Sequence, residues 1–371
     1  MDILWIDPFH GGSHAAVAAG YAARSSHRVH LLTLAQAGGW RWRMRGGAVT
    51  LARMARELQV SPDLIVTSDM LDLATFRALS GGQFRDVPVA IYFHENQLTY
   101  PLPPGRRRDL SFAWINYTSA LAADAVIFNS AFHRRDFLAA LPDLLGRFHD
   151  YQELETIPAI TAKSYVLTPG IDLTSLDQPA PLRSAGEPPV ILWNARWEYD
   201  KQPERFFRAL EHVAAQGTRF RLIVAGEHID PGAPEFRAAR ERWAARIVHW
   251  GYAPSRAAYA GLLQRADLVV STAIQEFFGI AVLEALYCGC APLLPNRLNY
   301  PDLLPPDLHA TTLYGDAQLE AALLAALTWI HAHNRAYWRT FAEPYRWEVR
   351  SPQYDRFFGD LVAAVPKIQA E

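Results

Sequence analysis

Short apolar runs alternate with helical patterns along most of the chain. The first run, residues 3–6, leads into a polar loop at 7–14 and then into an alanine-rich stretch with helical spacing. A strand, a glycine turn and a helix in that order open a doubly wound fold, in which ligands bind beyond the carboxyl ends of the strands. The Gly11-Gly12 pair in the loop does not match GxGxxG, so a nicotinamide cofactor is not favoured.

Strand and helix patterns continue to alternate along the chain, with one interruption at residues 177–189. Further strands are predicted at 29–34, 64–67, 87–93, 125–129 and 165–168. Residues 177–189 contain four prolines and a glycine, which is typical of a linker between domains. Beyond it, strands are predicted at 190–193, 220–225, 247–250, 268–271 and 291–294, and helices at 203–216, 234–245 and 255–265. Strands that alternate with helices form parallel sheets.

We therefore expect an α/β protein with two Rossmann-like, doubly wound domains facing a cleft. A chain of 371 residues is long enough for both. The expected domains are residues 1–180 and 187–345. Residues 346–371 form a tail in which a helix over 347–368 crosses back to the first domain.

Composition narrows the class of protein. Half of the residues are hydrophobic, a fifth are charged and the net charge is −2, as in an ordinary globular protein without an overall basic coat. The start of the chain lacks the pattern of a signal peptide and no run approaches a membrane span, so we expect a cytoplasmic protein. Cys288 and Cys290 are too few to hold a metal and are predicted to be buried structural thiols.

The segment 276–284 is the first candidate for chemistry. Glu276 and Glu284 are separated by seven residues, with Gly279 between them at the predicted start of a helix. The amides near Gly279 and Ile280 would have no partner within the helix and suit phosphate oxygens, while Glu284 suits ribose hydroxyls. Glu276 suits the sugar or developing positive charge. The alternative is an acidic N-terminal region that only stabilises the helix.

A second candidate follows the first strand of the second half. Arg196 and Lys201 stand in the sequence Asn-Ala-Arg-Trp-Glu-Tyr-Asp-Lys, where they are expected at the carboxyl edge of the sheet. Two cations at that edge suit a diphosphate, and arginine can bind it through two hydrogen bonds. The alternative is surface pairing with Glu198 or Asp200.

These motifs occur together in a known family. Arg196 and Lys201, Ala225-Gly226-Glu227, Trp250-Gly251-Tyr252 and Glu276-x7-Glu284 stand in the order seen in retaining glycosyltransferases of the GT-B fold, family 4. The resemblance implies metal-independent transfer of a sugar from a nucleotide diphosphate sugar, with no cofactor. Arg196 and Lys201 would hold the diphosphate, Glu284 the ribose and Glu276 the donor sugar. The segment from Trp250 to Tyr252 would flank the base, and the expected donor site also includes Gly12 and Phe278.

The first half is similar to a narrower family. Phe9-His10-Gly11-Gly12-Ser13-His14, residues 40–45 (Trp-Arg-Trp-Arg-Met-Arg), residues 92–101 and Phe128-Asn129-Ser130 resemble the tRNA-queuosine α-mannosyltransferases. The second half agrees through residues 196–201, 249–252, 276–279 and 287–290. This resemblance implies GDP-mannose as the donor and queuosine at the wobble position of tRNA(Asp) as the acceptor. Asn96 would lie on the acceptor side.

Two features of the first half bear on that acceptor. Residues 40–56 hold five arginines, two tryptophans and no acid. Tryptophan rings that stack on unpaired bases and guanidinium groups that bind phosphates suit an anticodon loop. Trp40, Arg41, Trp42, Arg43 and Arg45 are therefore the predicted acceptor contacts. The alternative is a helix edge that packs over the core, or a solvated surface.

His94 ends a predicted strand and is expected at the cleft. The resemblance implies a contact with the donor sugar, so Glu276 and His94 are the predicted catalytic residues. A core histidine bonded to backbone is the alternative, and His14 is assigned to capping or packing. No cluster has the spacing of metal ligands.

We therefore expect a mannosyltransferase that acts on tRNA and meets no membrane. Two other classes of function stay open. One is a family 4 enzyme that acts on a lipid or small-molecule acceptor at a membrane surface, because the Arg/Trp segment could lie in a membrane interface. The other is a non-catalytic protein that binds tRNA or a nucleotide.

Overall fold

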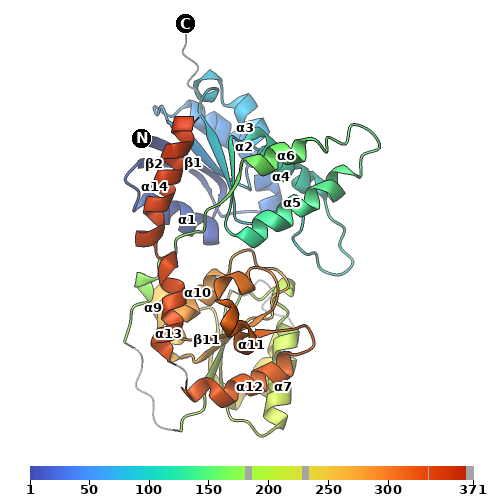
Figure 1. Ribbon diagram of the computed structural model, residues 1–371, viewed down its shortest axis with the longest axis vertical. Coiled ribbons are helices and arrows are strands. Elements are labelled where there is room, and N and C mark those ends of the chain that lie inside the picture. Colours follow the sequence, from blue (N-terminus) through green and yellow to red (C-terminus); the bar gives the residue numbers. More distant parts are fainter. Residues whose placement is uncertain (180–185, 228–233, 333, 365–371) are drawn as a thin grey trace. The chain divides into compact units, whose positions relative to one another are not determined.

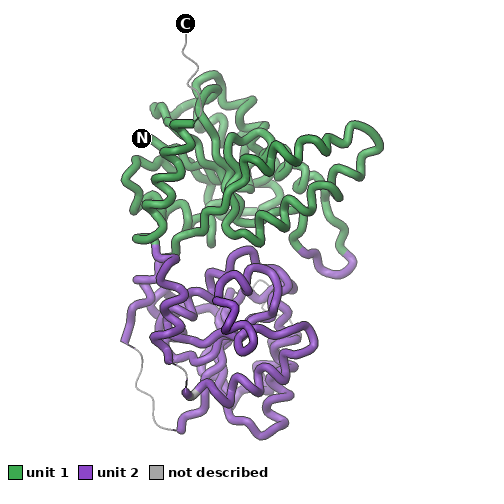
Figure 2. Tube along the Cα trace, viewed as in Figure 1, with its two compact units in different colours: residues 1–100, 106–171, 347–371 green, residues 101–105, 172–346 purple. Residues whose placement is uncertain are grey.

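The structure is a computed structural model that describes residues 1–179, 186–227, 234–332 and 334–364. It divides into two compact units (Figure 2). The first comprises Met1–Tyr100, Arg106–Ile171 and Trp347–Glu371, and the second comprises Pro101–Gly105 and Asp172–Arg346. The chain thus returns to the first unit for its last helix.

The first unit is built on a six-stranded parallel sheet with the order β2-β1-β3-β4-β5-β6 (Figure 1). Its strands are β1 (Asp2–His10), β2 (Arg28–Ala35), β3 (Leu64–Ser68), β4 (Val89–Phe93), β5 (Ala125–Phe128) and β6 (Ser164–Val166). Its helices are α1 (Gly12–Ala22), α2 (Trp40–Arg56), α3 (Leu73–Leu79), α4 (Leu110–Ala122), α5 (Ala131–Leu145), α6 (Thr156–Ala162) and α14 (Trp347–Ala364).

Both faces of this sheet are buried, because successive side chains of a strand point to opposite faces. In β1, Leu4 and Ile6 belong to the core beneath α2 to α6, whereas Ile3 and Trp5 belong to the core beneath α1 and α14. The second face would have little helical cover without α14. The last helix is therefore part of the first unit's core.

The start of α14 shows how closely it packs. The side chain of Trp347 is 1% exposed and lies against Gly20 and Gly170. A Cβ atom on either glycine would come within 2.2 Å of the indole ring. A residue with a side chain at either position would therefore displace the tryptophan.

The second unit repeats the architecture with a parallel sheet in the order β12-β11-β10-β7-β8-β9. Its strands are β7 (Val190–Asn194), β8 (Arg221–Ala225), β9 (Ile247–Gly251), β10 (Leu268–Val270), β11 (Ala291–Pro295) and β12 (Leu313–Tyr314). Its helices are α7 (Pro203–Ala215), α8 (Pro234–Arg242), α9 (Arg256–Arg265), α10 (Ile280–Tyr287), α11 (His309–Thr312), α12 (Leu319–Trp329) and α13 (Arg335–Ala342).

All of the predicted strands are present, with ends shifted by a few residues. Two features were not predicted. The strand β1 continues through the polar residues 7–10, where the sequence analysis placed a loop, and β12 is a two-residue strand. Of the proposed linker at 177–189, residues 180–185 lie outside the described residues, as do residues 365–368 of the proposed last helix.

Cys288 and Cys290 are both buried free thiols, as predicted. Burial raises the pKa of the Cys288 thiol to about 12. A thiol that stays protonated at neutral pH is a poor nucleophile and a poor metal ligand, so a structural role fits this residue.

Within the described ranges, no helix is long and apolar enough to span a membrane.

Candidate functional site

In the second unit, Lys201 and Glu276 meet at the carboxyl edge of the sheet. Lys201 lies in a 3₁₀ turn, Tyr199–Lys201, that follows β7, and Glu276 lies in the loop between β10 and α10. Lys201 Nζ donates to the Gln275 carbonyl at 2.7 Å and lies 3.9 Å from Glu276 Oε2. It is also 2.9 Å from Asp200 Oδ2. The ammonium group is therefore fixed next to the predicted catalytic carboxylate.

Arg196 lies on the loop just beyond β7 with a side chain that is 51% exposed. Its Nη2 is 3.1 Å from Glu198 Oε2. This is the surface pairing that the sequence analysis kept as the alternative. A half-exposed ion pair contributes at most about 1 kcal/mol, so an incoming anion can compete with Glu198 for the guanidinium group.

The start of α10 differs from expectation in one respect. Glu276 Oε1 accepts from the Gly279 amide at 3.0 Å and from the Phe278 amide at 3.4 Å. The Gly279 amide, which was expected to be available to phosphate, thus has a partner. Gly279 has a φ of +107°, and a Cβ there would lie 3.1 Å from Leu303. Only glycine adopts this backbone easily. The glycine turn therefore sets the position of the amides that donate to Glu276.

Glu284 also has a partner that the sequence analysis did not identify. Its Oε1 accepts from Arg256 Nη1 at 2.6 Å, and the residue is buried. Arg256, at the start of α9, donates further to the Ser175 hydroxyl and the Asp172 carbonyl, each at 3.0 Å. Burial and the nearby Glu284 carboxylate raise the pKa of Tyr259 well above its ordinary value. The carboxylate expected to bind ribose is therefore held in one orientation by a cation.

The aromatic residues of the predicted donor site separate into two kinds. The Trp250 ring packs within an aromatic group, with its centroid 5.5 Å from that of Trp197 and 5.8 Å from that of Phe207. Phe278 is buried beside Tyr345. Tyr252, in contrast, is 69% exposed. Of these three predicted donor residues, only Tyr252 presents most of its ring to a ligand.

In the first unit, His94 directly follows β4 and its backbone is held on both sides. Its N–H donates to Asp69 Oδ1 at 2.8 Å, and its carbonyl accepts from Asn129 Nδ2 at 2.9 Å. The ring lies 4.0 Å from that of His14 and 4.8 Å from that of Tyr92, measured between centroids. Gly12, with a φ of +52°, begins α1 two positions before His14.

His14 was predicted to cap or pack, but in the structure it pairs with a carboxylate. His14 Nδ1 lies 3.3 Å from Asp7 Oδ2, and both residues are buried. Burial opposes the charged form, yet the Asp7 carboxylate raises the pKa of His14 to about 9. Burial, followed by the charge on His14, holds the pKa of His94 well below its ordinary value. Of the two stacked rings, His14 is thus the one whose surroundings favour a proton.

The predicted acceptor residues at 40–45 form the first turns of α2. Trp40 packs on Phe112 at a centroid distance of 5.0 Å, and the Arg41 guanidinium lies 4.6 Å above the Trp40 ring. Trp42 is 71% exposed. Arg43 donates to the carbonyl groups of Ala35 and Ala37. The segment thus serves partly as a helix edge and partly as an open surface.

Arg45 and Asn96 have partners within the first unit. Arg45 Nη2 lies 2.6 Å from Asp109 Oδ2, and its guanidinium covers the Phe112 ring. Asn96 is fully buried, and its Oδ1 accepts from the amides of Leu98 and Thr99. Asn96 therefore shapes the turn after β4, whereas Trp42 and Arg41 form the open part of the surface.

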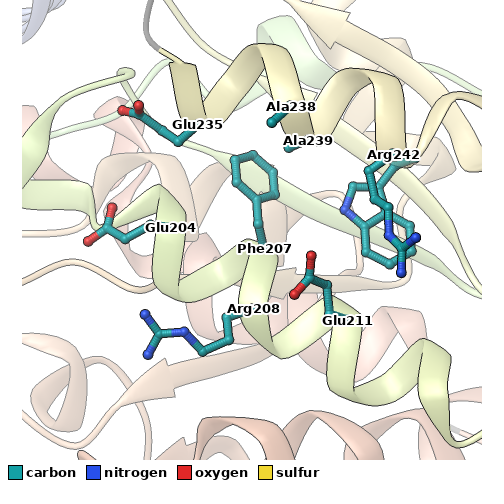
Figure 3. A pocket seen from close by; sticks show the side chains of 9 residues that line it. Glu204, Phe207, Arg208, Glu211, Glu235, Ala238, Ala239 and Arg242 are labelled. Carbon is teal, nitrogen blue, oxygen red and sulfur yellow. The ribbon is translucent and has the colours of Figure 1, made fainter.

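In the described part of the chain, no group of three or more His, Cys, Asp or Glu side chains is arranged to hold a metal ion. A groove of about 400 Å³ lies between α7 and α8, with Phe207 between the helices and Glu204, Arg208 and Arg242 at its sides (Figure 3). The residues that line it include none of the predicted donor or acceptor residues.

Comparison with known proteins defines the class. Residues 175–328 match the family described as "Glycosyl transferases group 1". The catalytic domain of starch synthase IV from Arabidopsis thaliana has a TM-score of 0.73 at 13% identity, covering 98% of this chain and 99% of that one. A glycosyltransferase from Rickettsia africae has a TM-score of 0.69 at 13% identity, with the same coverage. The predicted fold is confirmed, and the chain is a glycosyltransferase with the GT-B fold.

The first half is what distinguishes it among such enzymes. Residues 2–171 match the family described as "tRNA-queuosine alpha-mannosyltransferase N-terminal", and the tRNA-queuosine alpha-mannosyltransferase of Drosophila melanogaster is 31% identical over 316 residues, which are 82% of each chain. This chain belongs to the tRNA-queuosine α-mannosyltransferase family. A GDP-mannose-dependent phosphatidylinositol dimannoside mannosyltransferase of Mycobacterium tuberculosis is 25% identical over 84% of this chain and 76% of that one.

Proposed function

We propose that this enzyme transfers mannose, with retention of configuration, from GDP-mannose to queuosine at the wobble position of tRNA(Asp) in the cytoplasm. The observation that carries the proposal is the family match. Residues 2–171 match a family specific to tRNA-queuosine mannosyltransferases, and the likeness to the Drosophila relative extends along most of the chain. Two relatives whose names state GDP-mannose as the donor support that choice of nucleotide sugar.

On the donor side, Lys201 and Arg196 neutralise the diphosphate. Lys201 is a fixed cation and Arg196 is an exposed one that can reorient, which suits a group whose negative charge grows as the bond to the sugar breaks. With two cations in this role, no metal ion or other cofactor is needed. Glu284, oriented by Arg256, accepts hydrogen bonds from the ribose hydroxyls, and Tyr252 covers the base.

The transfer itself takes place on one face of the sugar. The bond from the anomeric carbon to the diphosphate oxygen breaks, and a bond from the same carbon to an acceptor hydroxyl oxygen forms. The acceptor proton moves to the leaving phosphate, so no separate general base is required. Glu276 stabilises positive charge on the sugar ring beside Lys201, and His94 binds a sugar hydroxyl.

On the acceptor side, the exposed Trp42 ring offers a face on which an unpaired base of the anticodon loop can stack. Arg41 and the other arginines of α2 bind phosphates. A stacked ring is worth about 1–3 kcal/mol per base, and each phosphate contact adds a term that weakens as the salt concentration rises.

The rival function is transfer to a lipid acceptor, which the likeness to the mycobacterial phosphatidylinositol dimannoside enzyme favours. The test offers the purified protein a panel of labelled sugar nucleotides. The acceptors are tRNA from cells that make queuosine, tRNA from cells that lack it, and vesicles that contain phosphatidylinositol. We expect label from GDP-mannose in the first acceptor alone. Label in the vesicles, or equal label in both tRNA samples, would contradict the proposal.

A further inference from the structure

A group of buried polar side chains lies at the carboxyl edge of the first unit's sheet. It includes Asp7 at 0% exposed, His14 at 6% and His94 at 9%. The proposed chemistry uses only His94. Burying an aspartate and two histidines is costly unless their polar atoms are paired, so the arrangement calls for an explanation beyond packing.

The Asp7 carboxylate is held in one orientation. Its Oδ1 accepts from the Phe9 amide at 2.9 Å and from the Ser68 hydroxyl at 3.1 Å. This leaves Oδ2 directed to the histidines, at 3.3 Å from His14 Nδ1 and 3.9 Å from His10 Nδ1. Two different segments of the first unit thus aim a buried negative charge at His14.

The His14 ring in turn lies against the face of the His94 ring. The two rings stack with an interplanar angle of 28°, and His94 is enclosed on another side by Tyr92. The backbone contacts to Asp69 and Asn129 prevent His94 from moving away. His94 Nε2 is buried and has no hydrogen-bond partner among the residues that the structure describes. A buried ring nitrogen without a partner needs an explanation, and a substrate hydroxyl group would supply the missing hydrogen bond.

We propose that Asp7 and His14 are positioning residues for His94: their ion pair keeps a positive charge stacked on the His94 ring, so that His94 meets the substrate as a neutral imidazole whose Nε2 binds a hydroxyl group. This inference rests on the proposed function, which assigns that hydroxyl group to the donor sugar. A neutral imidazole can accept from a hydroxyl group or donate to it, whereas a charged one can only donate.

The charges around the two rings support this state. Stacked imidazoles cannot both be protonated without strong repulsion, and the Asp7 carboxylate favours the proton on His14, whose pKa rises to about 9. The other titratable groups that face the pair are His10, Asp69, Glu95 and His133. Burial raises the pKa of Asp69 to about 7, which reduces its negative charge near neutral pH. Burial lowers the pKa of His133, so that ring does not supply a second positive charge.

The first measurement needs no substrate. Nitrogen-15 NMR of the full chain with labelled histidine follows each ring from pH 5 to pH 9. We expect His14 to be protonated at pH 7.5 and His94 to be neutral throughout. In Asp7→Asn, His14 should become neutral at pH 7.5. The pKa of His94 should then rise, because losing the charge on His14 outweighs losing the smaller, opposite effect of the Asp7 carboxylate. A neutral His14 in the wild-type protein, or ring signals that Asp7→Asn leaves unchanged, would overturn the inference.

The second measurement follows kcat/KM for GDP-mannose against pH. The variant is Asp7→Asn, or His14→Gln should Asp7→Asn fail to fold. In either variant protonation of His94 becomes easier, so the fall of kcat/KM on the acidic side of the profile, its acid limb, should move to higher pH. His10→Asn, which touches Asp7 but not the stack, should keep the wild-type limb. A uniform loss of activity with an unmoved limb would mean a merely structural role and would contradict the inference. The expected NMR pattern without mannose transfer would instead contradict the proposed function alone.

Discussion

Replacing Arg256 with methionine should weaken the binding of GDP. Arg256 Nη1 lies 2.6 Å from Glu284 Oε1, with the two side chains 40% and 10% exposed. Breaking an exposed pair costs about 0–1 kcal/mol and stranding one charge of a fully buried pair costs about 3–5 kcal/mol. A pair with one buried partner should fall between these values. Without Arg256, the Glu284 carboxylate loses its fixed direction toward the ribose.

The loss of one oriented hydrogen bond to a charged group is worth about 1.5–3 kcal/mol, so the Kd for GDP should rise by about tenfold or more. Isothermal titration calorimetry with GDP measures it directly.

Four variants make a double-mutant cycle: wild type, Arg256→Met, Glu284→Gln and the double variant. If the two residues act together, the double variant should bind GDP no more weakly than Glu284→Gln alone. Arg256→Lys keeps the charge but not the planar fork and should restore only part of the affinity. Arg265→Met, an exposed arginine on the same helix, is the matched control. A folded Arg256→Met protein with wild-type affinity for GDP would refute the reasoning.

Four further predictions concern the donor, the acceptor and the fold. Lys201→Ala should lower kcat/KM for GDP-mannose at least about tenfold, and activity should survive excess EDTA; a loss that Mg²⁺ or Mn²⁺ restores would contradict the diphosphate site. Trp42→Ala should reduce transfer to tRNA while leaving slow hydrolysis of GDP-mannose intact, and an equal loss of both would assign the ring to the fold. Gly20→Ala should lower the free energy of unfolding by about 1–3 kcal/mol, measured by denaturant titration; an unchanged midpoint would show that Trp347 does not press on Gly20.

The fold could be predicted because its strands are buried on both faces. Such strands appear in the sequence as apolar runs, and 64–68 or 190–193 are easily recognised. The polar end of β1 was missed because Asp7 and His10 look like loop residues, and β12 is too short to give a pattern. The carboxyl-edge rule also predicted that Arg196 and Lys201 lie just beyond the end of β7, where the structure has them.

The partners of the individual side chains in the site could not be predicted from strand patterns or from the carboxyl-edge rule. Arg256 and Glu284 are 28 positions apart in the sequence, and no motif links them. Asp7, His14 and His94 come from three segments that meet only when the sheet and α1 are assembled. In the same way, the arginine count in α2 did not reveal that Arg43 binds backbone carbonyls or that Arg45 binds Asp109. Residue type and order predicted the class of site, whereas the partner of each charge required the folded chain.

Nucleoside mass spectrometry of tRNA(Asp) tests the central claim most directly. Purified tRNA(Asp) that contains queuosine is incubated with the protein and GDP-mannose, digested to nucleosides and compared with a reaction that contains Glu276→Gln. The account predicts that the queuosine signal is replaced by a nucleoside heavier by one hexose residue, that α-mannosidase removes the added mass, and that the variant converts far less. An unchanged queuosine signal with active, folded protein and intact GDP-mannose would contradict it.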